Sequence, residues 1–178
     1  MIETKRLLLR PFGAEDLDII YRLYSDAEIM RYMPPDRMDR DAAQAHLDRI
    51  VQNWQADPPL SRELAVVRKD SGEKIGRARV LWEPEHDAVM IGWMLIQDEW
   101  GKGLASEMTR AMVDFCFSQL GVHRVYALCN PDNGASRRVL ERCGLRLEAR
   151  LREKCPYRRK GEILWQDELV YAILASDR

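Results

Sequence analysis

Two glycines separated by one lysine, Gly101-Lys102-Gly103, stand where an apolar run gives way to a long amphipathic pattern. The run from Ile91 to Ile96 has the length of a strand, and apolar residues from Leu104 onward recur with the period of a helix. Glycine lets the backbone turn tightly and lets a ligand approach the main chain. The first N–H groups of a helix lack internal partners and favour negative charge. The pattern therefore predicts a site that cradles a phosphate or pyrophosphate.

Three kinds of phosphate-binding turn have this general form. A P-loop requires Gly-x-x-x-x-Gly-Lys-Ser/Thr, which is absent here, and a dinucleotide fingerprint requires a third Gly or Ala where Ser106 stands. The third kind is the turn that holds the pyrophosphate of coenzyme A in GNAT acetyltransferases, which Trp100–Glu107 resembles. A Gly-x-Gly turn is also common as a purely structural turn, so the elements around it must decide.

The segments before this turn indicate an antiparallel sheet. Four apolar or alternating segments predict strands, and the last three are joined by short turns. Strands joined in this way are antiparallel neighbours, which excludes a doubly wound dinucleotide-binding fold. The four segments are Thr4–Pro11, Leu60–Lys69, Lys74–Trp82 and Ala88–Ile96.

Two amphipathic helices are expected between the first and second strands. The first covers Ala14–Tyr24, and the second follows Asp39 or Asp41, either of which can act as its N-cap. The proline pairs Pro34-Pro35 and Pro58-Pro59 bound the second helix. Two interpretations of these helices stay open, a plain helical cap on the sheet and a wall of an acceptor-binding site.

The chain after the glycine turn predicts a helical crossover. Gly121 ends the long helix, and the strand that follows is parallel to the fourth because a helix joins them. A turn rich in Asn, Pro and Asp leads into another helix, which Gly144 ends. The later segments are a fifth strand at Val122–Cys129, a turn at Asn130–Gly134, an alternating strand at Leu145–Lys154, a basic loop at Tyr157–Gly161 and a last strand at Ile163–Leu174.

Composition limits the class of protein. The chain has 178 residues without a repeat or linker, so residues 1–178 are expected to form one domain. We expect an α+β fold, a mixed and mostly antiparallel sheet of about seven strands with about four helices. With 28 basic and 29 acidic residues, the chain has no electrostatic bias toward nucleic acid or a membrane.

The cysteines and histidines predict a cytoplasmic protein without a metal site. The four cysteines lack Cys-x-x-Cys spacing and are interpreted as reduced thiols. The three histidines lie far apart in the sequence, so no metal site is predicted. No 18-residue apolar run predicts a membrane span, and the N-terminus enters a strand rather than a signal peptide.

Four blocks of the sequence, in order, resemble GNAT-superfamily N-acetyltransferases. The helix motif Asn133-x-x-Ser136 and the following Gly144-Leu145 resemble the Asn-x-x-Ser helix and Gly-Phe of that family, with Leu145 in place of Phe. The N-terminal Thr4-x-Arg6-Leu7-x-Leu9-Arg10-Pro11 and the C-terminal Trp165-x-Asp167 with Tyr171-x-x-Leu174 resemble the ribosomal-protein Nα-acetyltransferase branch, the RimJ/RimL-like enzymes. One departure is Asp98, where the superfamily has a Gln or Arg before the glycine turn.

The resemblance implies a GNAT fold whose fourth and fifth strands splay apart at Met94–Ile96, with acetyl-CoA as the acyl donor. It implies that pantetheine pairs there with the backbone of Met94, Leu95 and Ile96 and that N–H groups near Leu95 stabilise an oxyanion. The pyrophosphate would lie on the amides of Trp100, Gly101, Lys102, Gly103, Leu104 and Ala105. Ser136 is the candidate donor of a proton to the leaving thiolate, and Asn133 would bind pantetheine or position its helix. Both also have a plain explanation as helix-start residues.

No carboxylate in the sequence stands out as a general base, and this bears on the acceptor. Glu83, Glu107, Glu148 and Glu153 all have explanations as turn, helix-start or solvated residues. Without a strong base, an α-amine is easier to deprotonate than a lysine, so a protein or peptide N-terminus is the expected acceptor. Three alternatives stay open: an N-acetyltransferase acting on a small amine such as an antibiotic, polyamine or amino acid, a non-catalytic acyl-CoA sensor, and, by analogy only, a homodimer.

Overall fold

The computed structural model describes residues 1–33, 37–54, 61–159 and 162–178. The expected proline boundaries of the second helix, Pro34-Pro35 and Pro58-Pro59, lie outside the described residues. No helix among the described residues is long and apolar enough to cross a membrane.

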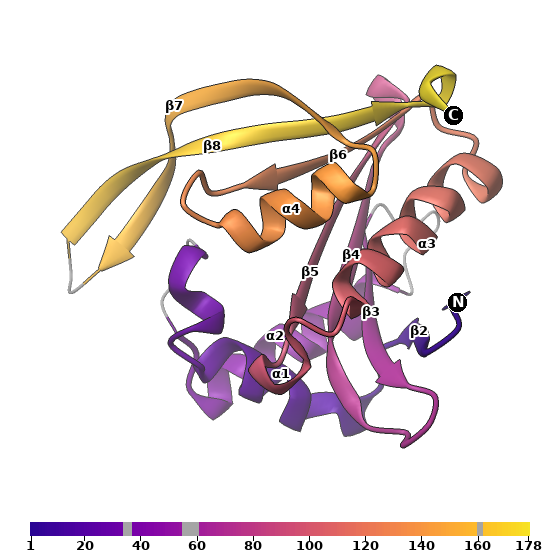
Figure 1. Ribbon diagram of the computed structural model, residues 1–178. Helices are drawn as coiled ribbons and strands as arrows, with labels where there is room; N and C mark the ends of the chain where they lie inside the picture. Colours follow the sequence, from indigo (N-terminus) through magenta and orange to yellow (C-terminus); the bar gives the residue numbers. More distant parts are fainter. Residues whose placement is uncertain (34–36, 55–60, 160–161) are drawn as a thin grey trace.

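In the part of the chain that the structure describes, a single eight-stranded sheet forms the centre of the molecule, in the order β1-β2-β3-β4-β5-β6-β8-β7 (Figure 1). Every neighbouring pair is antiparallel except β5 and β6, which are parallel as the helical crossover predicts. About seven strands were expected, and the additional one is the two-residue β1. The strands are β1 Ile2–Glu3, β2 Leu7–Pro11, β3 Ser61–Arg68, β4 Lys74–Glu83, β5 Ala88–Leu95, β6 Arg124–Cys129, β7 Arg146–Arg159 and β8 Glu162–Leu174.

Four α-helices among the described residues cover the sheet, two on each face. They are α1 Leu17–Ser25, α2 Arg40–Asn53, α3 Leu104–Gln119 and α4 Gly134–Arg142. The side chain of Asp39 accepts a hydrogen bond from the N–H of Ala42, so Asp39 rather than Asp41 is the N-cap of α2. In Figure 1, α3 and α4 lie in front of the strands, with α2 behind them.

The register shows which side chains share each face. Arg77 and Arg79 of β4 stand opposite Met94 and Gly92 of β5. Arg77 contacts Tyr24 of α1, so these alternate residues lie on the face covered by α1 and α2. On the other face, Arg137 of α4 donates to the hydroxyl of Tyr171 in β8. We call the first of these the α1/α2 face.

The stripe of apolar residues predicted for the long helix is its buried side. Leu104, Met108, Met112 and Cys116 are fully buried and recur at the helical period. Gly144 ends α4 with φ near +88°, and Leu145 donates back to the carbonyl of Leu140. Glycine is favoured in this left-handed position, which explains why the helix stops there.

The C-terminal hairpin differs from the sequence prediction. β7 is longer than expected and runs through Tyr157–Arg159, which were predicted as part of a loop. Its register shifts twice, and Glu153 takes a positive φ of 47°. Leu147 and Leu151, two leucines of the alternating pattern, are exposed on β7, which is an edge strand of the sheet.

Candidate active site

The parallel pair β5 and β6 opens part of the way along its length. Ala88–Met90 pair with Arg124–Tyr126, and the pairing ends there. β5 continues to Leu95 with β4 as its ladder partner, while β6 continues to Cys129 beside β8. The two strands therefore separate beyond Met90, and the expected Met94–Ile96 segment lies at the far end of this opening.

The backbone of Leu95 faces the opening. Ile96 donates its N–H to the carbonyl of Ile75 at 2.9 Å, which makes Ile96 and Ile75 a hydrogen-bonded pair. Hydrogen-bonded and non-hydrogen-bonded pairs alternate along an antiparallel ladder. The neighbouring pair, Leu95 and Gly76, is therefore not hydrogen-bonded. The N–H and C=O groups of Leu95 point away from β4 and toward β6. The indole Nε1–H of Trp100 donates to the Leu95 carbonyl at 2.8 Å.

Gly76 allows β4 to lie unusually close to the backbone of β5 at Met94 and Leu95. A Cβ built on Gly76 would stand 2.3 Å from the carbonyl oxygen of Met94 and 2.6 Å from a methyl carbon of Leu95. Only a residue without a side chain allows β4 and β5 to approach so closely. The sequence does not reveal this requirement, because it depends on the neighbouring strand.

The glycine turn has the geometry of an anion-binding site. Gly101 and Gly103 have φ angles of 75° and 76°, in the left-handed region that glycine adopts at little cost. Gly103 is the N-cap of α3 and offers no side-chain cap, so the first N–H groups of the helix keep their hydrogen-bonding capacity. The turn follows a short 3-10 segment at Gln97–Glu99, directly after the end of β5.

Lys102 is already paired within the turn. Its Nζ lies 3.0 Å from Glu99 Oε1, and Arg68 of β3 donates to the other oxygen of the same carboxylate at 3.1 Å. Burial acts to raise the pKa of Glu99, but the hydrogen bonds from Lys102 and Arg68 outweigh it and hold that pKa below its usual value. The backbone amides of the turn are therefore better placed than the lysine side chain to bind an anion.

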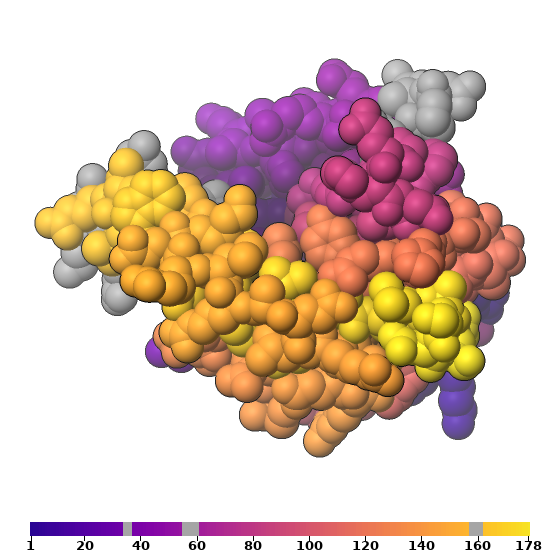
Figure 2. Space-filling model, turned by 90° about the horizontal axis from the view of Figure 1, so that it is seen from above, coloured from indigo at the N-terminus to yellow at the C-terminus, as the bar shows by residue number. Residues whose placement is uncertain are grey.

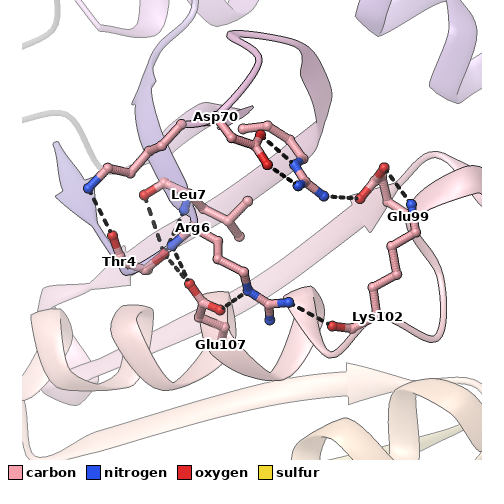
Figure 3. Close-up of polar contacts among 9 residues, drawn as sticks. Thr4, Arg6, Leu7, Asp70, Glu99, Lys102 and Glu107 are labelled. Atoms are coloured by element: carbon pink, nitrogen blue, oxygen red, sulfur yellow. Dashed lines mark hydrogen bonds and ion pairs between the residues drawn. The ribbon is translucent and has the colours of Figure 1, made fainter.

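A second ion-pair cluster fastens the turn to the N-terminal segment (Figure 3). Glu107 of α3 accepts hydrogen bonds from the Thr4 hydroxyl at 2.6 Å, the Arg6 N–H at 2.8 Å and Arg6 Nε at 2.6 Å. Arg6 also donates to the backbone carbonyl of Lys102 at 3.0 Å. Burial opposes ionisation of Glu107, but these hydrogen bonds lower its pKa. The motif Thr4-x-Arg6 thus holds the glycine turn in place.

Asp98, which stands where the superfamily has Gln or Arg, forms an ion pair with α1. Asp98 accepts from Arg22 Nη2 of α1 at 2.8 Å, and the adjacent Gln97 bonds to the carboxylate of Asp26. Both side chains therefore connect the segment before the turn to the end of α1.

Asn133 and Ser136 lie at the start of α4, which follows the C-terminal end of β6. The side chain of Asn133 accepts a hydrogen bond from the Ser136 N–H at 3.0 Å, so Asn133 is the N-cap of the helix. Both residues are half-buried. Their place beside the end of β6 puts them at the same end of the sheet as Leu95.

A pocket of about 580 Å³ lies between the 3-10 segment Ile29–Tyr32, the turn after β6 and the C-terminal hairpin. In Figure 2 the surface is hollowed between the purple N-terminal part and the orange and yellow hairpin. Its polar groups include the carboxylates of Asp132 and Asp167. Asp167 is bound by Arg150 at 2.6 Å, whereas no partner of the Asp132 side chain is found among the described residues. The lining is Arg31, Tyr32, Asn130, Pro131, Asp132, Arg150, Trp165, Gln166 and Asp167.

Two of the carboxylates considered from the sequence lie at the other end of β6. Glu83 accepts from the Tyr126 hydroxyl at 2.7 Å, and Glu148 is paired with Arg124. Burial, and then the contact with Glu83, raises the pKa of Tyr126 to about 12. Glu107 is occupied by Thr4 and Arg6, so none of these three is placed as a base for chemistry at Leu95.

Within the described ranges, no group of three or more His, Cys, Asp and Glu residues is arranged to hold a metal ion. All four cysteines are free thiols, and Cys116 and Cys129 are buried. Burial raises the pKa of Cys116 to about 12 and, with smaller contributions from nearby charges, that of Cys129 to about 11. These two thiols are therefore structural rather than nucleophilic.

Comparison with known proteins gives a family match over most of the chain. Residues 6–146 match the model of the acetyltransferase (GNAT) domain. YnaD, an uncharacterized N-acetyltransferase of Bacillus subtilis (strain 168), is 31% identical over 99% of this chain and 98% of its own. The spermidine N(1)-acetyltransferase of Escherichia coli (strain K12) is 25% identical, covering 80% of this chain and 74% of its own.

Solved structures agree with the fold. A GNAT-family acetyltransferase from Bacillus anthracis superposes with a TM-score of 0.85 at 26% identity, over 97% of both chains. RimJ from Mycobacterium smegmatis, solved in complex with CoA-disulfide, gives a TM-score of 0.80 at 22% identity, over 96% of this chain and 83% of its own. These likenesses confirm the fold class expected from the sequence.

Proposed function

The chain belongs to the GNAT family of acetyltransferases, and we propose that this acetyl-CoA-dependent enzyme acetylates the α-amine of a peptide or protein N-terminus. The observation that carries the proposal is the opening between β5 and β6, with the Leu95 N–H turned into it and the carboxylates of Glu83, Glu107 and Glu148 paired elsewhere.

The residues of the opening fit the thioester chemistry. Acetyl-CoA supplies an activated acetyl group, and attack by an amine puts negative charge on its carbonyl oxygen. A fixed N–H at the position of Leu95 would stabilise that charge, which is usually the largest contribution in acyl transfer. The uncapped amides of α3 behind Gly101 and Gly103 would bind the pyrophosphate. Ser136 would donate the proton that the departing thiolate needs.

The choice of an α-amine follows from the energy of deprotonation. A lysine amine with a pKa of about 10.4 must lose a proton at a cost of about 4.6 kcal/mol at pH 7. An α-amine with a pKa of about 7.7–8.0 needs only about 1–1.4 kcal/mol. Because Glu83, Glu107 and Glu148 are paired away from Leu95, a site that relies on water or backbone carbonyls suits the second amine. The RimJ/RimL-like motifs of the sequence support the same choice.

The pocket beside the opening would receive the acceptor. It is bordered by Asp132, which immediately precedes the cap of α4, and an exposed carboxylate attracts an ammonium group. Its volume of about 580 Å³ lies within the usual range of about 300–1,000 Å³ for small-ligand sites. The pocket can therefore attract the ammonium group of the acceptor before its amine reaches Leu95.

A matched pair of peptides tests the proposal. One carries only a free α-amine, and the other is Nα-blocked with one free lysine; each is incubated with acetyl-CoA and analysed by mass. We expect acetylation of the first, with Gly103→Val as the inactive control. Preferential acetylation of the lysine peptide would contradict the proposal.

A second candidate is a polyamine acceptor. The carboxylate of Asp132 favours it because a polyamine carries several positive charges, whereas Asp167 is already paired with Arg150. The likeness to the spermidine enzyme of Escherichia coli supports it as well. Spermidine added as a third substrate separates the two: acetylation of spermidine with neither peptide modified would favour the polyamine.

A further inference from the structure

Four of the five buried side-chain atoms that lack a hydrogen-bond partner among the described residues gather at one place on the α1/α2 face. They are His46 Nε2, Glu63 Oε2, Arg77 Nε and Arg79 Nε. Buried polar atoms are nearly always paired, so such a concentration needs an explanation. Glu63 Oε2 lies 3.1 Å from Arg77 Nη1, an ion pair without hydrogen-bond geometry.

The charges of this cluster do not balance. Arg77 is buried against Glu63, and its cation also lies over the ring of Tyr24 at 5.5 Å. Arg79 and Arg49 add two further positive charges beside the same single carboxylate. Burial and then the nearby Arg49 and Arg79 lower the pKa of His46, so the neutral imidazole is favoured and neither adds to nor offsets this positive charge.

Arg79, like Arg49, has no ion-pair partner among the described residues, although it stands opposite Glu63 in the register of β3 and β4. Among the residues that the structure describes, no hydrogen bond or ion pair involves its guanidinium, although the group is half-buried. It acts electrostatically on His46 and Glu63 on one side and on Tyr126 of β6 on the other. A half-buried guanidinium with free donors is suited to bind an oxyanion.

Open space lies next to this arginine. Gly92 of β5 stands directly opposite Arg79, and a Cβ built on Gly92 would meet no atom within 4 Å. Gly92 precedes Leu95 by three residues, which corresponds to about 10 Å at the strand rise of about 3.3 Å per residue. An extended peptide spans this distance in about three residues.

We infer that Arg79 binds a carboxylate of the acceptor, on an acidic side chain within the second to fourth residues of the peptide that is acetylated. The inference rests on the proposed function and names the class of N-terminus that the enzyme prefers. An acceptor with its α-amine at Leu95 and its chain along the α1/α2 face would bring such a side chain to the space above Gly92. The unbalanced positive charge of the cluster disfavours a lysine or arginine at the same position.

A panel of amidated peptides tests the inference. Glu replaces Gln at the second, third or fourth residue of an otherwise neutral sequence, and kcat and KM are measured for wild type, Arg79→Gln and a control, Arg142→Gln. Arg142 is exposed at the end of α4 and serves as a matched loss of one arginine.

At one of these positions we expect wild type to prefer Glu over Gln by about tenfold or more in kcat/KM, the effect of one charge-assisted hydrogen bond, mainly through KM. Arg79→Gln should lose this preference while acetylating the Gln peptide as wild type does, and Arg142→Gln should keep it. Equal use of Glu and Gln peptides by wild type, or an unchanged preference in Arg79→Gln, would overturn the inference while leaving the proposed function intact. Failure to acetylate any α-amine would overturn both.

Discussion

Replacing Gly76 with alanine should slow acetyl transfer far more than it weakens acetyl-CoA binding. The new Cβ would stand 2.3 Å from the carbonyl oxygen of Met94. Unforced C···O contacts are about 3.3–3.6 Å, so β5 must move by about 1 Å. The atom in the way belongs to the backbone, and it cannot move without shifting the N–H of Leu95.

The expected magnitude follows from the geometry of the oxyanion. A misplacement of about 1 Å can cost about 100-fold in rate, and loss of one oxyanion donor costs about 100- to 1,000-fold in kcat. We therefore expect kcat to fall about 100-fold. Crowding in a packed sheet costs about 1–3 kcal/mol of stability, which most domains tolerate. The affinity for acetyl-CoA should change little, because the glycine turn at Gly101–Gly103 is held by separate contacts.

The assay measures thiol release for kcat and calorimetric titration for the acetyl-CoA dissociation constant. Val122→Ala is the control for lost stability, because Val122 is buried and precedes β6 outside the opening. It removes the equivalent of about two methylenes, or about 1.5–3 kcal/mol with the cavity included. A folded Gly76→Ala protein with a kcat close to wild type would refute the idea that Gly76 positions the Leu95 N–H.

Three further predictions concern the glycine turn, the start of α4 and the ion-pair contacts of Glu107 in α3. Gly103→Val should abolish acetyl-CoA binding in calorimetry, because valine is disfavoured at φ 76° and its side chain crowds the amides; unchanged affinity would remove the turn from the site. Ser136→Ala should lower kcat about 100-fold while leaving acetyl-CoA affinity nearly unchanged, and an unaltered kcat would make Ser136 only a helix-start residue. Since the folded pKa of Glu107 is lowered, its ionised contacts stabilise the protein above the unfolded pKa of about 4.3 and lose that effect as pH falls through the folded pKa. In denaturant titrations, Glu107→Gln should therefore lower the free energy of unfolding at pH 7 but not in acid. A decrease that is the same at both pH values would contradict this assignment.

The parts of the site that local patterns encode were predictable. A strand, two glycines and an amphipathic stripe are neighbours in the sequence, so Gly101, Gly103 and the start of α3 could be placed without a structure. The parallel pairing of β5 and β6 followed from the helix between them. Asn133 as a helix cap followed from its residue type and position.

The parts that depend on contacts between distant segments could not be predicted in this way. Glu107 was interpreted as a helix-start charge, but its partners Thr4 and Arg6 lie about a hundred positions away, where no local pattern connects them. The need for glycine at residue 76 appears only when β5 lies against it. An alternating pattern also does not reveal that β7 lies at the edge of the sheet, where Leu147 is exposed.

The central claim is that acetyl-CoA binds in the opening with its thioester against the N–H of Leu95. Residue-resolved amide hydrogen exchange, measured by NMR with and without acetyl-CoA, tests it most directly. We predict slower exchange at Leu95, whose amide points into the opening, and little change at Met94, whose amide faces β4. Acetyl-CoA bound to the protein, as shown by calorimetry on the same sample, with unchanged exchange at Leu95 would contradict the account.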